Sequence, residues 1–325
     1  MMKKVNVILH LLIFIMLFNS YLIADNDWPV LKGPYLGQKP PGKIPKIFAP
    51  GIISTGFDEL FGCFSSDGEE FYYILGGRPV WVILIIKEIN GIWTKPRVAP
   101  FSGQYGAKFC LSPDSNKVVL TSRQPVNGKS KPSKKLHTWV VERTMDGWGK
   151  LKFIKSIIDA LAPSLAANGN LYYMLGPQGK QEICMSKFVD GQYSEPTNLG
   201  DAVNSDQDEA DPFVAPDESY IIFGSNRIEG DGLYICYKKR DGSWTKAKNM
   251  GSGISSFSGI NVSSVSPDGK YLFFFCNQSK YEPYSEKPLT YEEKIKILSG
   301  PGNGSLDIYW MSAQVIEDLK PVELK

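Results

Sequence analysis

The densest group of acidic residues in the chain is the segment DAVNSDQDEADP at residues 201–212. Two carboxylates that face one pocket roughly 5–10 Å apart can hydrolyse a glycosidic bond, so Glu209 and Asp211 are the candidate catalytic residues. The same segment joins two strand-rich units, and there Glu209 and Asp211 could instead fix how a strand enters its sheet. We favour this structural role. Carboxylates could also bind a divalent cation here, but the spacing is not that of an EF-hand loop, so we predict no metal site.

Other catalytic chemistries lack the residues they need. Beyond residue 24 the chain has one histidine, His137, which begins a strand-like segment beside Trp139. A single histidine in such a place argues against a His-dependent nucleophilic triad and against a His-rich metal site. The sequence also has no GxSxG motif and no phosphate-binding glycine loop. We therefore predict no catalysis and no cofactor.

A second set of polar residues recurs at near-equivalent places, each just after an aromatic strand-like run. Its members are Arg78, Arg123, Asn226, Arg227 and Asn277. Arginine offers a rigid fork of donors to carboxylate or phosphate, so a ring of such residues could bind an anionic ligand or an acidic partner. In the other interpretation, which we favour, each arginine bonds groups of its own unit.

The elements that would position these residues come from an internal repeat. Five segments share an apolar run, a Pro-Asp-Gly-like turn and an aromatic alternating run, which together predict a β-hairpin. The turn residues are Asp67, Asp114, Asn168, Asp217 and Asp268, at intervals of 47, 54, 49 and 51 residues. Each unit continues with a third strand and a Trp- or Tyr-bearing fourth. Units of four strands at this period predict an all-β fold, the β-propeller.

The last unit lacks a fourth strand, and its replacement is expected from the other end of the chain. IPKIFAPGIIS at 44–54 resembles the fourth-strand sequence WTKPRVAPFSG at 93–103, so we expect Lys46–Ile53 to pair with the third strand of the last unit, within 306–316. Closure in this way leaves no exposed sheet edge. Five blades are predicted, and six are the alternative if the diverged segment 123–165 contains another.

Several further segments complete the predicted organisation. Residues 1–24 place Lys3 and Lys4 before an apolar run, as in a secretory signal peptide, although an uncleaved anchor stays an alternative. Residues 25–43 are expected to be extended, 44–318 to form one propeller domain, and 319–325 to be a tail. Within the domain, 279–305 reads as an insertion with a short helix, because Thr290 and Glu293 are spaced as a capping box.

Charge and cysteine content narrow the partners and the compartment. Without Lys3 and Lys4, the 36 Lys and Arg residues become equal in number to the 34 Asp and Glu residues. A balanced surface gives no general attraction to nucleic acid. The five cysteines are odd in number and lie mostly in apolar runs, so we predict buried thiols rather than a disulfide framework.

The repeat pattern DPFVAPDESYIIFGSNR, continued by SPDGKYLFFF and GSLDIYWMSA, resembles the WD-like β-propeller repeat of bacterial envelope proteins, the TolB type. The resemblance covers about residues 44–316. It implies an exported scaffold, periplasmic or secreted, that binds a protein or glycan partner without catalysis. The family's six blades and separate N-terminal domain are not matched here. We expect a monomer with no stable membrane span after signal cleavage; the alternative is a carbohydrate-active enzyme, a glycosidase or lyase, with paired carboxylates at the channel mouth.

Overall fold

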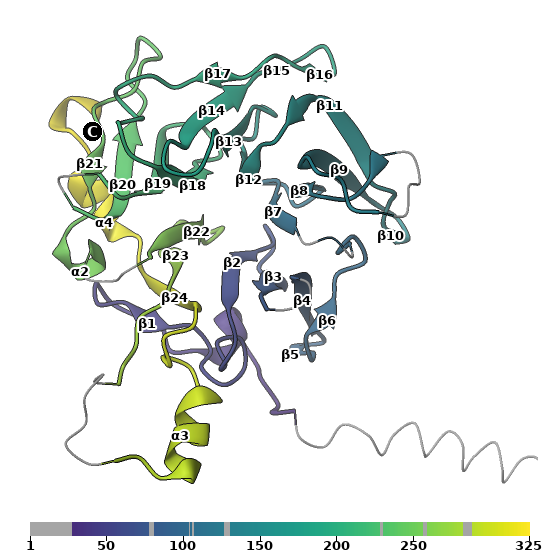
Figure 1. The fold of residues 1–325 in the computed structure, drawn as a ribbon, viewed down its shortest axis with the longest axis vertical. Coiled ribbons are helices and arrows are strands. Elements are labelled where there is room, and N and C mark those ends of the chain that lie inside the picture. The colour runs from purple at the N-terminus through teal and green to yellow at the C-terminus, as the bar shows by residue number, and fades with distance from the viewer. Residues whose placement is uncertain are drawn as a thin grey trace, which may run out of the picture.

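The computed structural model describes residues 28–77, 81–103, 105, 107–126, 131–227, 230–255, 259–281 and 288–325. The predicted signal peptide and Arg78 lie outside these residues. Five antiparallel sheets stand around a central axis as the blades of a propeller (Figure 1). The predicted five-bladed fold is confirmed.

Each blade contributes one innermost strand to the wall of the axis, and the chain then moves outward strand by strand. The innermost strands are β2 (Glu59–Phe64), β7 (Ala107–Leu111), β12 (Leu161–Leu165), β18 (Glu209–Val214) and β22 (Asn261–Val265). The second strands are β3 (Glu70–Leu75), β8 (Lys117–Ser122), β13 (Leu171–Leu175), β19 (Tyr220–Ser225) and β23 (Tyr271–Cys276). The third strands are β4 (Val82–Ile89), β9 (His137–Thr144), β14 (Glu182–Ser186), β20 (Gly232–Tyr237) and β24 (Asp307–Ser312). The outermost strands are β6 (Arg97–Val98), β11 (Lys152–Ile158), β17 (Thr197–Asn198), β21 (Lys248–Asn249) and β1 (Lys46–Ile47).

The ring closes through the N-terminal strand. β1 pairs with β24 in antiparallel register, with Lys46 opposite Trp310 and Ile47 opposite Tyr309. The Phe48 amide then donates to the Ile308 carbonyl at 2.8 Å, which extends the contact by one residue. The fifth blade is therefore completed by chain from before the first blade, as predicted. The described residues of the segment 123–165 form the third and outer strands of the second blade and the innermost strand of the third, so they hold no sixth blade.

The repeated turns have one geometry. In the first, second and fifth blades a serine hydroxyl donates to the turn aspartate two residues on, for example Ser112 Oγ to Asp114 Oδ1 at 2.5 Å. The aspartate also accepts the backbone amide two residues later, as Asp217 does from Ser219. These side-chain bonds take the place of strand-to-strand backbone hydrogen bonds where the chain reverses direction. The position after the aspartate has positive φ, which explains the glycines at 68, 169 and 269.

The predicted fourth strands are corrected in one respect. In the first blade the tryptophan-bearing piece is a short return strand, β5 (Ile92–Trp93), and the outermost strand β6 begins four residues later. Pro96 lies between the two pieces, and a proline cannot donate to a strand ladder. The third blade repeats this arrangement with Pro196, where β15 (Phe188–Val189) and β16 (Gln192–Tyr193) form a separate hairpin. In the second blade β10 (Gly147–Trp148) returns on β9 before β11 begins.

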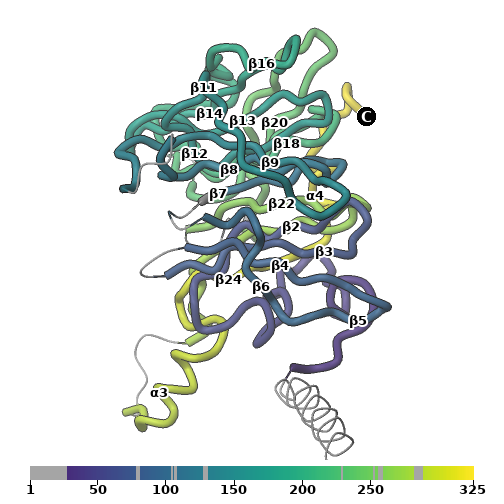
Figure 2. Tube along the Cα trace, turned by 90° about the vertical axis from the view of Figure 1, so that its right-hand side faces the viewer, coloured from purple at the N-terminus to yellow at the C-terminus, as the bar shows by residue number. Residues whose placement is uncertain are grey.

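The remaining helices are short and lie outside the sheets. They are η1 (Pro34–Gly37), α2 (Ser252–Ser255), α3 (Tyr291–Leu298), α4 (Gln314–Leu319) and η3 (Val322–Leu324). The capping box expected in the insertion is present at α3, where Thr290 and Glu293 bond reciprocally. Figure 2 shows α3 projecting away from the ring. No helix in the described part of the chain is long and apolar enough to cross a membrane.

Candidate functional site

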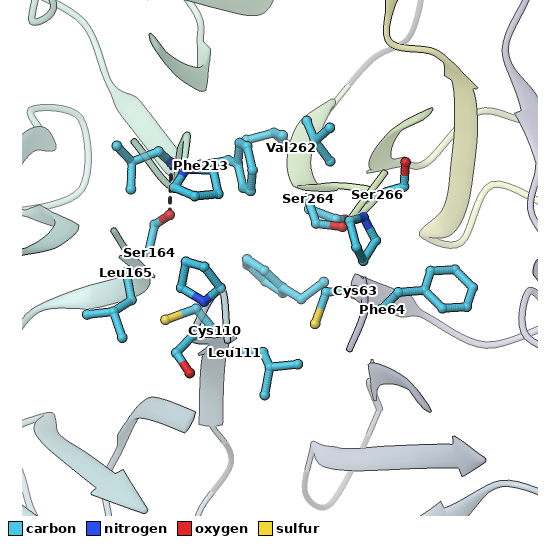
Figure 3. Close-up of a pocket in the computed structure, with 18 of the residues that line it drawn as sticks. Cys63, Phe64, Cys110, Leu111, Ser164, Leu165, Phe213, Val262, Ser264 and Ser266 are labelled. Atoms are coloured by element: carbon cyan, nitrogen blue, oxygen red, sulfur yellow. Dashed lines mark hydrogen bonds between the residues drawn. The ribbon is translucent and has the colours of Figure 1, made fainter. Parts of the chain in front are cut away.

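A cavity of about 300 Å³ lies on the propeller axis. All five innermost strands line it, and so do the turns that follow them, including Ser66, Pro113, Pro216 and Pro267. The cavity is therefore at the end of the axis where the β-turns gather, which we call the turn face. Figure 3 shows Cys63, Cys110, Ser164, Phe213, Val262 and Ser264 around it. Because each blade contributes equally placed residues, the wall is a product of the repeat.

The wall is apolar with scattered hydroxyl groups, and within the described part of the chain no charged side chain or histidine lines it. Ser164 Oγ accepts the Val214 amide at 2.9 Å, and Ser264 Oγ donates to the Gly62 carbonyl at 2.7 Å, so both hydroxyls hold strands of neighbouring blades together. The Ser263 hydroxyl is buried and has no hydrogen-bond partner in the described part of the chain. A buried polar group without a partner is costly.

Two thiols, Cys63 and Cys110, line the same cavity from neighbouring blades. Burial raises the pKa of Cys63 to about 12, and it raises the pKa of Cys110 further, with a contribution from Cys63. The thiolate is the nucleophilic form, so both thiols are unreactive at neutral pH. All five cysteines are free.

The axis is crossed by an ion pair beside the cavity. Lys108 Nζ of β7 lies 2.6 Å from Asp211 Oδ1 of β18, and it stands 5.0 Å from the centre of the Phe61 ring, which lines the cavity. Asp211 has φ of 47° and lies at a β-bulge, as Phe61 and Ala162 do in the first and third blades. The bulge turns the side chain toward the axis. Asp211, a candidate catalytic residue, is therefore held by a lysine.

Glu209, the other candidate, is fully buried in a network of its own blade. Its carboxylate accepts from the Ser205 amide and hydroxyl, from Ser225 Oγ and from Arg227 Nη2 at 2.8 Å. Arg227 also donates to the Val203 carbonyl and lies over the Tyr234 ring. Three of these donors bond Oε1 and one bonds Oε2, and Glu209 does not line the axial cavity.

The remaining residues of the proposed arginine rim are placed separately. Arg123 is exposed and donates to the Lys134 carbonyl at 2.9 Å. Asn226 accepts the Asp208 amide at 3.0 Å, and Asn277 is exposed. Arg227 is buried, with its guanidinium committed to Glu209. The two described arginines of this rim, Arg123 and Arg227, therefore bond groups of their own blades. His137 is likewise local, because Nε2 bonds Ser133 Oγ and the ring packs against Phe153.

The turn residues Asp67, Asp114, Asn168, Asp217 and Asp268 are exposed and surround the turn face. Burial would raise the pKa of Asp268, but hydrogen bonds from Ser266 and Lys270 outweigh this and lower it to about 2. The pKa of Asp114 is lowered in the same way by Ser112 and Asn116. These carboxylates are therefore negative at neutral pH.

Sequence reasoning missed one buried pair of acids, Glu59 and Asp307, at the junction of the first and fifth blades. Burial raises the pKa of Glu59 to about 7 and that of Asp307 to about 6. Thr55 donates to Glu59 from its amide and hydroxyl, as Ser205 does to Glu209. Glu59 could have been found from the repeat, because Asp58-Glu59 aligns with the candidate pair Asp208-Glu209. Neither acid lines the axial cavity, and the described residues contain no cluster of three potential metal ligands.

The fold and the axial site define a five-bladed β-propeller with a central cavity. No protein-family profile and no curated protein matches the chain. Among solved structures, TolB from Acinetobacter baumannii is 17% identical over 74% of this chain and 52% of that chain, with a TM-score of 0.46. This chain thus spans about half the length of that protein. A putative TolB from Agrobacterium tumefaciens is 14% identical over 79% of this chain and 90% of that chain, with a TM-score of 0.48.

An α-L-arabinofuranosidase from Lactobacillus brevis is similar to the same degree. It is 12% identical over 80% of this chain and 91% of that chain, with a TM-score of 0.46. The two TolB structures and the arabinofuranosidase are therefore similar to this chain to a comparable degree. These similarities concern the fold alone, and function has to be argued from the site.

Proposed function

We propose that the chain is a non-catalytic scaffold that binds a protein or glycan partner in the cell envelope, with the axial cavity at the turn face as the binding site. One observation carries the proposal. The cavity is lined by serine, proline, cysteine and aromatic or aliphatic side chains from all five blades, and no carboxylate, amine or imidazole of the described residues is among them. A concave, mostly apolar site with a few polar groups is suited to binding.

The competing function, carbohydrate hydrolysis, requires two carboxylates that converge on a substrate. Glu209 and Asp211 do not meet this requirement, because each is buried in an ion pair with Arg227 or Lys108. Breaking either pair to free a carboxylate would leave an uncompensated charge in a buried place. The described residues therefore favour binding over catalysis.

The cavity also constrains the bound group. Its volume of about 300 Å³ admits one side chain or one sugar ring and excludes a folded element. The apolar wall favours a group with an apolar face. The envelope location rests on the signal-like N-terminal sequence and on the repeat resemblance described above.

The test is a cavity-filling variant, Ser263→Phe. This change adds bulk to the cavity and removes no hydrogen bond, because the hydroxyl has no partner within the described residues. Residues 25–325 would be immobilised and used to capture partners from an envelope extract of the source organism. We expect Ser263→Phe to reduce capture of the wild-type partner at least about tenfold, since hot-spot contacts at buried centres dominate binding.

The matched control is Met145→Phe, which adds an aromatic ring at a fully exposed hairpin tip. It should capture the partner as the wild type does. Circular dichroism melting checks that both variants are folded. Equal capture by Ser263→Phe and wild type would contradict the proposal. Treating the captured material with protease or with periodate separates a protein partner from a glycan.

A further inference from the structure

A second hollow opens beside the axial cavity, under the N-terminal segment 31–42, which we call the strap. One end of the strap is fixed to the first blade, where the Trp93 amide and indole donate to the Leu31 and Gly33 carbonyls at 3.0 and 2.9 Å. Its other end is fixed to the fifth blade, where the Ser312 amide donates to the Gly42 carbonyl at 2.8 Å. The strap therefore bridges the two blades at which the ring closes.

The middle of the strap is held by Tyr35. Its ring lies 5.3 Å from Phe64, 5.0 Å from Tyr271 and 5.5 Å from Trp310, in edge-on or tilted arrangements. The next residue, Leu36, is fully buried. Aromatic contacts with both blades thus hold the strap in place beside the hollow.

The hollow is a groove of about 830 Å³ between the strap and the turns of the first and fifth blades. We call it the strap groove. Its lining comprises seven strap residues between Lys32 and Pro40, residues 66–69, and Phe64, Glu88, Pro267, Asp268, Lys270 and Tyr271. Phe64, Ser66 and Pro267 line both the strap groove and the axial cavity. The two hollows are therefore neighbours on the turn face, within reach of one extended ligand.

The strap groove carries an excess of negative charge. Four of its lining residues are acidic, Asp67, Glu69, Glu88 and Asp268, against Lys32 and Lys270. Lys270 is already paired with Asp268 at 3.1 Å. The Glu88 amide donates to the Glu69 carbonyl at 2.7 Å, which places these two residues side by side. Within the described residues, neither the Glu69 nor the Glu88 carboxylate has a hydrogen bond or an ion pair. A cationic ligand would therefore find two uncommitted carboxylates beside aromatic rings.

We propose that the strap groove binds a lysine or arginine side chain of an extended protein segment, while a neighbouring apolar residue of that segment enters the axial cavity. This deepens the proposed function, on which it rests, by naming the partner as a protein with a basic segment. A guanidinium can bond carboxylates and lie over a tyrosine ring together, and Tyr35 and Tyr271 are half-exposed in this groove. An extended chain advances roughly 3.3 Å per residue, so adjacent residues reach adjacent hollows. A neutral glycan carries no positive charge that could interact with the excess negative charge of the groove.

The probe is the peptide acetyl-Phe-Gly-Arg-Arg-amide, compared with acetyl-Phe-Gly-Gln-Gln-amide, by isothermal titration calorimetry with residues 25–325. We expect the arginine peptide to bind at least about tenfold more tightly than the glutamine peptide, with an advantage that shrinks as salt is added. The double variant Glu69→Gln/Glu88→Gln should lose most of this advantage. Both side chains are without partners in the described residues, so folding should be unaffected.

The matched control is Glu195→Gln/Glu292→Gln, which makes the same change of net charge at exposed positions that line neither hollow. It should bind the arginine peptide as the wild type does. Equal binding of the arginine peptide by Glu69→Gln/Glu88→Gln and wild type would overturn the proposal, and so would equal affinity for the two peptides. If either result occurs while Ser263→Phe still loses its partner, the strap groove proposal fails and the binding function of the axial cavity stands.

Discussion

Lys108 and Asp211 form an ion pair at 2.6 Å across the propeller axis, although they belong to the second and fourth blades and are 103 residues apart. The pair ties together two innermost strands that are not neighbours in the ring. It also removes from the axis the carboxylate that a hydrolytic mechanism would need. One ion pair thus both stabilises the fold and neutralises the Asp211 carboxylate.

Removing one partner of this pair should destabilise the fold. We expect Lys108→Met or Asp211→Asn to lower the free energy of unfolding by about 2–4 kcal/mol, because each leaves a buried charge or an unsatisfied group behind. Asparagine tolerates the positive φ at position 211, so backbone strain is not the cause. Urea unfolding measures the loss, and the double variant should lose less than the sum of the two. Simple additivity would show that the pair is not coupled.

The buried arginine of the fourth blade should matter far more than the exposed one of the second. We expect Arg227→Met to lower the free energy of unfolding by about 3–5 kcal/mol, since Glu209 would stay buried without its counter-ion. Arg123→Met should change it by less than about 0.5 kcal/mol, because its guanidinium is exposed. Similar losses in thermal unfolding would contradict this account of the arginine rim.

Stability should depend on pH through Glu59. Its pKa in the folded chain, about 7, is above the unfolded value, so the folded state holds the proton more tightly. The resulting stabilisation is complete below the unfolded pKa, about 4.3, and is lost as the pH rises toward 7. Glu59→Gln imitates the protonated acid at every pH. Its stability relative to wild type should therefore rise between pH 4.5 and 7.5, by on the order of 2 kcal/mol. A difference that does not change with pH would argue against the raised pKa.

Ring closure should depend on Phe48, the residue that follows β1. Its side chain is fully buried, with ring centres of Phe71, Phe273 and Trp310 at 5.0, 5.2 and 5.2 Å. We expect Phe48→Ala to cost about 3–5 kcal/mol in urea unfolding, whereas Ile44→Ala, at a position 79% exposed, should cost almost nothing. A small effect of Phe48→Ala would mean that the N-terminal strand contributes little to the ring.

The thiols should be protected in the native chain. Burial raises the pKa of Cys63, Cys236 and Cys276 to about 12 and that of Cys184 to about 11. At pH 8 the thiolate fraction is then below about one in a thousand. We expect no rapid reaction with a disulfide reagent such as dithiobisnitrobenzoate, and five reacting thiols after unfolding in guanidinium. One thiol that reacts within seconds in the native chain would contradict this prediction.

The sequence predicted the features that repetition and local turn chemistry specify. The turns at Asp67 and Asp268 could be predicted because their residue types act locally. The serine hydroxyl bonds the aspartate, the aspartate accepts a backbone amide, and the glycine adopts positive φ. The closing strand could be predicted because Lys46 and Ile47 lie in a fourth-strand sequence pattern that no first, second or third strand precedes. The repeat pattern did not predict that the outer strands of the first and third blades are split. The split occurs at Pro96 and Pro196, because a proline has no backbone N–H to donate to the strand ladder.

What the sequence did not predict comes from contacts between distant residues. The Lys108–Asp211 pair depends on a β-bulge that turns one side chain to the axis, and periodicity does not locate a bulge. Tyr35 and Leu36 both have positive φ, at 55° and 57°, which nothing in their residue types suggests. Glu69 and Glu88 meet only because the β3–β4 hairpin brings them together. The axial cavity and the strap groove therefore required the structure.

The central claim is that the turn face holds a partner at the axis, and photocross-linking tests it most directly. Ser66 lines both hollows with an exposed side chain, so p-benzoylphenylalanine at this position would lie at the mouth without filling the axial cavity. Irradiation in cells of the source organism should give one discrete cross-linked partner, identified by mass spectrometry, that is absent when the same photoreactive group replaces Met145. No adduct from position 66, or the same adducts from both positions, would contradict the account.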